Sequence, residues 1–230
     1  PSLGVTREDP GKLVLGSVPV EPDGSAHFKV PGGVNVFFQA LDERGMALQT
    51  MRTLTYAQPG HTMACIGCHE QRFEAPPNTS GAAALRPPSP ITPGPEGSWP
   101  LRYDRLVQPI LDRHCVKCHS PKGNAKAVKK LDLTPAKSYA ALIGYGKLGD
   151  YVRRHYLRGY SEVGAGAARN SVLLAHLAKG HQQVALSADD RARLIVWMDT
   201  YAQTQGHFSP AQERALEAFR RRMAALLAQR

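Results

Sequence analysis

The sequence is short of acidic residues and of long apolar runs, and both shortages narrow the class of protein. Its 230 residues contain 19 Asp and Glu but 29 Lys and Arg, which gives a formal net charge of +10. This balance predicts either a solvated basic surface or a docking surface for an acidic partner. The basic residues do not alternate with aromatic ones along one face, which argues against nucleic-acid binding. No apolar run approaches the roughly 20 residues of a membrane-spanning helix, so we expect no membrane span.

The beginning of the sequence, PSLGVTREDP, lacks both a methionine and the apolar stretch of an export signal. We therefore expect a processed chain or a piece of a longer one, and this beginning does not argue against export. Hydrophobic residues make up 42% of the chain, which is enough to build a buried core. The length suits one large domain or two small ones.

No cysteine is left over for a disulfide between distant segments, because all four lie in two short motifs, CIGCH and CVKCH. The motifs consist of Cys65, Cys68 and His69, and of Cys115, Cys118 and His119. Two thioethers at this spacing can bond both vinyl groups of a porphyrin, and the next residue then lies under the iron. The motifs therefore predict two covalently bound haem c groups, with His69 and His119 as proximal iron ligands.

A zinc site and a redox dithiol are the alternative interpretations of the cysteine pairs. Zinc-binding pairs usually lie about 15–20 residues apart, whereas 46 residues separate Cys68 from Cys115. A redox dithiol needs no adjacent histidine, so haem attachment is favoured. Because cytosolic compartments rarely assemble c-type haem, we expect a periplasmic or extracellular protein. The propionates of two haems would lower the nominal charge to roughly +6.

The first half of the chain is typical of β structure followed by a linker. The candidate strands KLVLGSVPV, AHFKV, VNVFFQALD and ALQTMRTLTYA are separated by turns rich in proline, glycine and aspartate. They predict a small antiparallel β-sandwich-like haem domain over residues 1–74, which ends in the first motif. Residues 75–100 contain eight prolines. They predict a semi-rigid linker, or a coil that wraps the domain surfaces.

Residues 101–205 predict an all-α domain like a class I cytochrome c, which makes the fold class α+β. YDRLVQPILDRHC has apolar residues at helical spacing, with Pro109 expected in the first turn of the motif-bearing helix. SYAALI and NSVLLAHLAKG are shorter helix candidates, and the second ends at Gly180. SADDRARLIVWMDTYAQ predicts the clearest helix, with Ser187 as its N-cap. One face of that helix carries Leu194, Trp197, Met198 and Tyr201.

The last segment, residues 206–230, predicts a C-terminal amphipathic helix over 209–229. We expect this helix to pack on its own body, and a role at a membrane surface or a partner is the alternative. Its apolar stripe consists of Leu216, Phe219, Met223 and Leu226.

The second haem needs a further strong ligand opposite His119, normally Met or His. The only methionine in reach is Met198, on the face of a helix that we expect to pack. His181 follows a helix-ending glycine 62 residues after His119, where a cytochrome of this size returns across its haem. We therefore predict His181 as the ligand and keep His176 as the alternative. Two histidine ligands give a lower potential than His with Met.

The first haem has no clear second ligand in the sequence. His61 lies eight residues before His69 and is our candidate, while Met63 lies six before it. His27 lies on a candidate strand, and His155 would have to reach over from the helical unit. An open, five-coordinate iron is the alternative, and such an iron could bind small molecules.

The sequence resembles the hydrazine synthase alpha subunit family over roughly residues 12–205. The stretch from VPVEPDGSAHFKVP to MRTLTYAQPGHTMACIGCHEQR resembles the middle domain of that family. VQPILDRHCVKCH and LAKGHQQVALSADDRARLIVWMD resemble its C-terminal haem domain. The resemblance implies one haem c in each domain, with His119 and His181 on the second iron and the first haem as the reactive one.

Two departures from the family affect the function that the resemblance implies. The family's enzyme ligates its reactive iron with a tyrosine four residues after the motif histidine, and this position is Phe73 here. The enzyme also carries an N-terminal β-propeller, and the 230 residues contain no stretch of that length. Both departures favour electron transfer over hydrazine synthesis.

The sequence thus predicts a dihaem cytochrome that transfers single electrons to a redox protein partner. A lysine-rich stretch near the second motif would steer an acidic partner, or is simply a solvated loop. The alternatives are a redox enzyme, with peroxidase-like or nitrogen-compound chemistry at an open first haem, and a haem module of a larger complex. The lysines are Lys117, Lys122, Lys126, Lys129 and Lys130.

Overall fold

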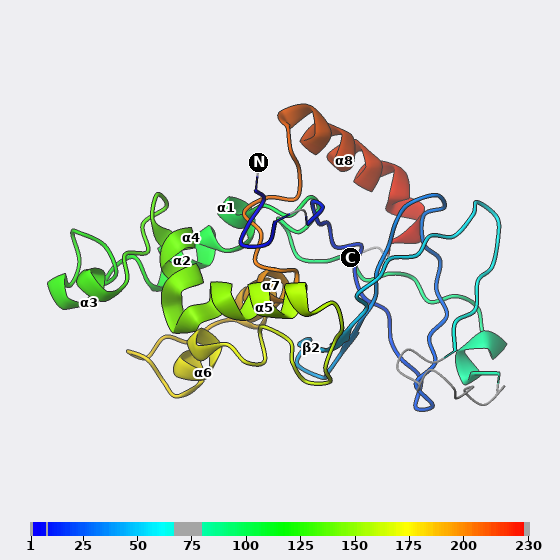
Figure 1. Cartoon of the computed structure of the whole chain (residues 1–230), viewed down its shortest axis with the longest axis horizontal. Coiled ribbons are helices and arrows are strands. Elements are labelled where there is room, and N and C mark those ends of the chain that lie inside the picture. The colour runs from blue at the N-terminus through cyan, green and yellow to red at the C-terminus, as the bar shows by residue number, and fades with distance from the viewer. Residues whose placement is uncertain (1, 8, 67–79, 228–230) are drawn as a thin grey trace.

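The computed structural model of the protein describes residues 2–7, 9–66 and 80–227. Helices gather at one end of the long axis, with α3 (Ala125–Lys130) at the tip, and irregular extended chain forms the other end (Figure 1). A hairpin of β1 (Gln39–Leu41) and β2 (Ala47–Thr50) lies between them. Within the described residues, no helix is long and apolar enough to cross a membrane.

The helical end is built from short helices connected by turns. They are α1 (Tyr103–Leu106), α2 (Gln108–His114), α3, α4 (Ser138–Gly144), α5 (Leu148–Arg158), α6 (Val172–Ala178) and α7 (Ala188–Asp199). The longer α8 (Pro210–Arg222) follows, and short 3₁₀ turns lie at η1 (Ala82–Leu85), η2 (Tyr145–Lys147) and η3 (Met223–Leu226).

Several helices begin where the sequence predicts, because their caps and first turns have the expected chemistry. The Ser187 hydroxyl accepts a hydrogen bond from the Asp190 N–H and caps α7. Ser171 caps α6 in the same way, and Ser209 caps α8. Pro109 lies in the first turn of α2, where its missing N–H costs nothing. The structure also contains α3 and α5, which the sequence pattern does not predict.

The apolar face of α7 forms the centre of the helical core. Trp197 and Met198 are fully buried, and the Trp197 indole N–H donates to the Gln203 carbonyl at 3.0 Å. The Tyr103 ring packs edge-on against both Trp197 and Tyr139. Burial of each large apolar side chain contributes about 1.5–3 kcal/mol, so this face stabilises the helical end strongly. Met198 belongs to this core and is not available as an iron ligand.

The β part contains less regular structure than the sequence predicts. The hairpin pairs Gln39 with Thr50 in antiparallel register, and a single bridge joins Val36 to Thr55 beyond it. Ser17 and Phe28, from the expected first and second strands, form only isolated bridges to the proline-rich stretch.

Proline explains why those bridges do not extend into ladders. Ser17 pairs with Thr92, and Phe28 pairs with Ser89. Prolines surround these two partners, and a proline has no N–H to donate to a neighbouring strand. The fold is a mixed α+β one, and a sandwich is not confirmed. The neighbouring prolines are Pro87, Pro88, Pro90 and Pro93.

Hydrogen bonds between segments that are far apart in the sequence connect the N-terminal segment to the rest of the fold. Near the N-terminus, the Lys12 N–H donates to the Gln203 side chain at 3.0 Å, and the Leu3 carbonyl accepts from the Thr204 N–H at 2.7 Å. The described part of the proline-rich stretch also forms backbone hydrogen bonds, including Val14 N–H to Ser98 O at 2.9 Å. The division into residues 1–74, 75–100, 101–205 and 206–230 stays a prediction, and these contacts cross its boundaries.

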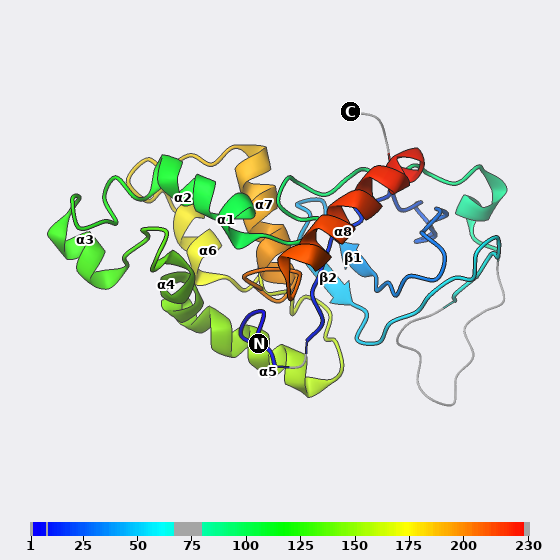
Figure 2. The ribbon, with the colours of Figure 1, turned by 90° about the horizontal axis from the view of Figure 1, so that it is seen from above.

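The C-terminal helix α8 packs on the body of the protein. The Trp99 indole N–H donates to the Leu216 carbonyl at 3.1 Å, and the Trp99 and Phe219 ring centres are 5.5 Å apart. Arg102 forms an ion pair with Glu213 at the other end of the contact. Figure 2 shows α8 running obliquely over the middle of the molecule, in front of the region of the hairpin.

Candidate functional site

The second cysteine motif forms a tight turn directly after α2. The Cys115 N–H donates to the Leu111 carbonyl at 2.8 Å, and the His119 N–H donates to the Cys115 carbonyl at 2.8 Å. The turn therefore places His119 one helical turn after Cys115, with Cys118 between them. Cys115 is partly buried, Cys118 is exposed, and both are free thiols. Burial and the neighbouring Cys118 raise the pKa of Cys115 to about 11.

The His119 side chain is oriented by the main chain that follows the motif. Its Nδ1 lies 2.9 Å from the Leu131 carbonyl oxygen, which places the ring proton on Nδ1. The Leu133 N–H donates to the His119 carbonyl at 2.8 Å and fixes the same loop. With Nδ1 engaged in this way, Nε2 is left to bind a metal, which is the usual arrangement of a ligating histidine.

The His181 ring lies close to the His119 ring. The centres of the two imidazole rings are 6.0 Å apart, and the ring planes are inclined by 43°. A metal–imidazole bond is about 2.0–2.1 Å and the ring centre lies roughly 1 Å beyond the nitrogen, so two imidazoles on opposite sides of one metal have centres about 6 Å apart. The separation and the two cysteines beside His119 fit a covalently attached haem with two histidine ligands.

An unusual backbone conformation positions His181. The chain turns after α6 at Gly180, which has a φ of +86°. Gln182 and Gln183 follow with φ of +47° and +60°, in the left-handed region that residues other than glycine rarely occupy. The Val184 N–H donates to the His181 carbonyl at 2.9 Å and closes the loop. His181 is thus displayed on a constrained loop.

His176, the alternative ligand, contacts His181 directly. Its Nε2 lies 2.9 Å from His181 Nδ1, and the two ring centres are 4.6 Å apart. Partial burial lowers the pKa of His181, and the neighbouring His176 and His119 lower it further. A lowered pKa favours the neutral imidazole, which is the form that binds metals.

The other candidate histidines have partners elsewhere in the fold. His155 stacks on Tyr151 at 4.1 Å between ring centres, and its Nδ1 lies 3.0 Å from the Tyr151 carbonyl oxygen. The Nδ1 of His27 lies 3.0 Å from the Arg86 carbonyl oxygen.

The first motif lies mostly outside the described residues, and Cys68, His69 and Phe73 are among those not described. Cys65, Met63 and His61 are described and exposed. The assignment of His61 to the first iron therefore stays a prediction. Within residues 2–7, 9–66 and 80–227, no group of three or more His, Cys, Asp or Glu residues could hold a metal ion.

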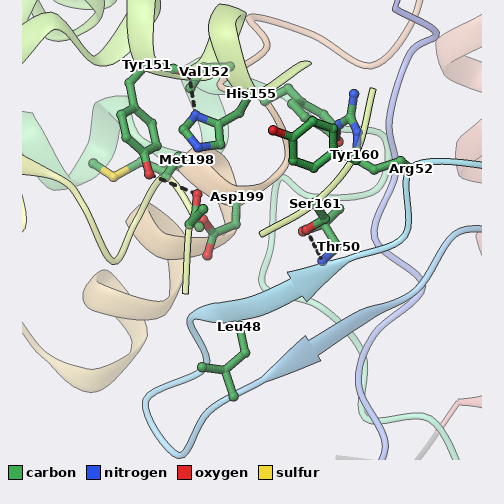
Figure 3. Close-up of a pocket in the computed structure, with 14 residues that line it drawn as sticks. Leu48, Thr50, Arg52, Tyr151, Val152, His155, Tyr160, Ser161, Met198 and Asp199 are labelled. Atoms are coloured by element: carbon green, nitrogen blue, oxygen red, sulfur yellow. Dashed lines mark hydrogen bonds between the residues drawn. The ribbon is translucent and has the colours of Figure 1, made fainter. Parts of the chain in front are cut away.

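A separate pocket lies between the hairpin and the helices (Figure 3). It has an empty volume of about 470 Å³, including the space open to solvent, and its wall includes Arg52, His155 and Tyr160. Asp199 at its base accepts hydrogen bonds of 2.9 Å from the Ala47 and Ala168 N–H groups. Burial raises the pKa of Asp199, although these bonds act in the opposite direction. No sequence motif marks this pocket, because its wall comes from segments far apart in the chain.

Comparison with known proteins identifies similarity in the first third of the chain. Residues 5–70 match the family described as hydrazine synthase alpha subunit middle domain. The hydrazine synthase subunit alpha of Kuenenia stuttgartiensis is 39% identical over 56 residues, which are 24% of this chain and 7% of that protein. The chain thus matches a small part of that relative's length. No solved structure matches the chain.

These matches confirm the resemblance to the hydrazine synthase alpha subunit family over the segment that includes the first motif. They relate the chain to a haem-containing redox family. The resemblance of residues 101–205 to the family's C-terminal haem domain stays a prediction.

Proposed function

We propose that this protein is a dihaem c-type cytochrome that transfers single electrons outside the cytoplasm. The observation that supports this most directly is the proximity of the His119 and His181 rings, whose centres are 6.0 Å apart, beside the thiols of Cys115 and Cys118. Residues 101–205 would then form a class I cytochrome c-like domain, with α2 leading into the motif.

In this proposal each side chain of the second site has a distinct role. Cys115 and Cys118 would hold the haem through thioether bonds, and His119 and His181 would bind its iron. When bound, the haem supplies a one-electron iron couple whose potential depends on its ligands and burial. The Leu131 carbonyl holds the proton of His119 on Nδ1 and so directs Nε2 toward the ligand position.

The first motif would hold the first haem. Cys65 and Cys68 would bond the porphyrin and His69 would bind its iron, with His61 as the candidate ligand on the other side. The match of residues 5–70 to the hydrazine synthase alpha subunit middle domain supports haem binding here, because it covers the whole motif.

The proposed partner is an acidic redox protein that docks near the second motif. Helix α3 lies at the tip of the molecule and has no buried residue, so its lysines face solvent (Figure 1). Lys126, Lys129 and Lys130 would attract acidic side chains and speed association, an effect that falls as salt is added. Assembly of covalent haem and such a partner both suit a periplasmic or extracellular location.

Haem counting tests the proposal. The mass of the purified chain, together with the pyridine haemochrome spectrum, should give two covalent haems per chain. Replacement of both Cys115 and Cys118 by alanine should leave one, and replacement of Cys65 and Cys68 should do the same. A wild-type chain that carries no covalent haem, when expressed with the c-type maturation machinery, would contradict the proposal.

A redox enzyme with an open first haem is the second candidate function. The similarity to a subunit of hydrazine synthase favours it, because that similarity includes the first motif. Carbon monoxide distinguishes the two functions. A relay protein should have two low-spin irons that do not bind it when reduced, whereas an open first iron should give a high-spin signal and bind it readily.

A further inference from the structure

We propose that His176 is a positioning residue for His181, which it orients by accepting a hydrogen bond from the ring, and that it thereby lowers the reduction potential of the second haem. This inference rests on the proposed function, since it concerns the iron that His181 would bind. The sequence alone makes His176 a competing ligand, and the contact between the two rings gives it a different role.

The geometry of the pair supports this role. His176 Nε2 and His181 Nδ1 are 2.9 Å apart, a normal hydrogen-bond distance. If His181 binds iron through Nε2, its proton must lie on Nδ1 and point at His176. His176 then accepts that proton's hydrogen bond at Nε2 and carries its own proton on Nδ1.

The position of His176 in the fold fits a local role. It lies in the last turn of α6, and the turn at Gly180 returns the chain so that His181 meets it. The side chain of His176 is exposed, so it contributes little to the core. Its ring nevertheless lies against the ring of His181, with centres 4.6 Å apart.

The two predicted ligands of the second iron thus differ in their hydrogen-bond partners. His119 contacts the Leu131 carbonyl, which no side-chain substitution removes. His181 contacts the side chain of His176, which can be exchanged. A ligating histidine that donates a hydrogen bond becomes a better electron donor to the metal. This favours the oxidised iron, so the contact lowers the potential and also fixes the angle of the His181 ring.

Substitution of His176 in the haem-loaded protein tests the inference. His176→Phe keeps a flat ring but accepts no hydrogen bond, so the midpoint potential of one haem should rise and its low-spin EPR signal should shift. His176→Gln offers a carbonyl oxygen as acceptor and should restore most of the wild-type potential. The matched control is His155→Phe, on α5 beside Tyr151, which should leave the potential of the second haem unchanged.

Two results would overturn the inference. The first is His176→Phe with unchanged potentials and EPR spectrum. The second is a high-spin iron in both His176→Phe and His176→Gln together with a low-spin iron in His181→Ala, because His176 and not His181 would then be the ligand. We expect His181→Ala to give a high-spin iron. If His176 binds the iron in His181→Ala, that variant stays low-spin and only the variant that lacks both histidines becomes high-spin. This result would support the proximity of the His176 and His181 rings.

Failure of the inference and failure of the proposed function have different signatures. The pyridine haemochrome assay counts covalent haems whether or not His176 acts on their potential. A wild-type chain without haem at Cys115 and Cys118 contradicts the proposed function itself. A chain with two haems and no response to His176→Phe contradicts the role of His176 alone.

Discussion

At the scale of single residues, the loop that carries His181 stands out for its backbone. Gly180, Gln182 and Gln183 all have positive φ. A residue other than glycine in this region costs about 1–2 kcal/mol, so the loop is held by its surroundings rather than by local preference. Such conformations are found at ligand sites, where a side chain has to be held in one position.

Gly180→Ala tests how far the position of His181 depends on this loop conformation. No other atom lies within 4 Å of a Cβ placed on Gly180, so the substitution adds backbone strain without a steric clash. We expect the free energy of unfolding to fall by about 1 kcal/mol in urea titrations. Because His181 is the next residue, the low-spin spectrum of the haem-loaded protein should also weaken.

Gly24→Ala is the matched control for this prediction. Gly24 has a φ of +83°, and a Cβ there also meets no atom within 4 Å. The control should lose a similar stability but keep the haem spectrum unchanged. Equal spectral changes in both variants would show that the Gly180 loop has no special connection to the iron.

The candidate site could be predicted from sequence only in part. The CVKCH motif predicts its own chemistry, and the glycine before His181 indicates a turn that can present a ligand. The hydrogen bond between His176 and His181 could not be predicted, because it depends on how the left-handed turn folds back on α6. The spacing of five residues is not one that a continuous helix brings together.

At the scale of elements, helices were predicted better than strands. The start of α7 follows from Ser187 and from the acidic residues after it, and its buried face follows from apolar spacing. These are local signals. The expected strands at residues 12–20 and 26–30 depend on their partners, and the proline-rich partner lacks the N–H groups that a ladder needs. Local patterns therefore indicated extended chain but not its pairing.

Asp199 at the end of α7 links the hairpin to the helices. Its two carboxylate oxygens accept the Ala47 N–H of β2 and the Ala168 N–H. Asp199→Asn replaces one acceptor by an NH₂ group that faces a backbone N–H. We expect a loss of about 1–3 kcal/mol in the free energy of unfolding, measured by urea titration.

The control for this prediction lies on the same helix. Asp189 is exposed and forms only a surface ion pair with Arg193. Asp189→Asn should change stability by less than about 1 kcal/mol. If Asp199→Asn costs no more than Asp189→Asn, the carboxylate does not hold the hairpin in place.

At the scale of the whole molecule, the second cysteine motif and the described segment that precedes the first motif lie at different ends (Figure 1). The turn of the second motif lies between α2 and α3, and the segment that leads to the first motif runs through the extended end (Figures 1 and 2). Two irons held at these two ends would interact weakly, because salt screens charges over about 10 Å at 0.1 M ionic strength.

We accordingly expect the two haems to titrate independently. A spectroelectrochemical titration should fit two one-electron steps, and removal of the second haem by Cys115→Ala with Cys118→Ala should leave the potential of the first unchanged. The single-haem variant that lacks Cys65 and Cys68 provides the reverse comparison. A shift of the remaining potential in either variant would indicate that the irons are coupled.

The proline-rich stretch affects whether molecules of this protein associate with one another. Extended chain with free N–H and C=O groups is a template on which another molecule can add a strand, the first step of aggregation. Around Thr92 and Ser89, the prolines remove most of the donors that such an added strand would need. The same residues that keep the β part irregular thus protect it from self-association at high concentration.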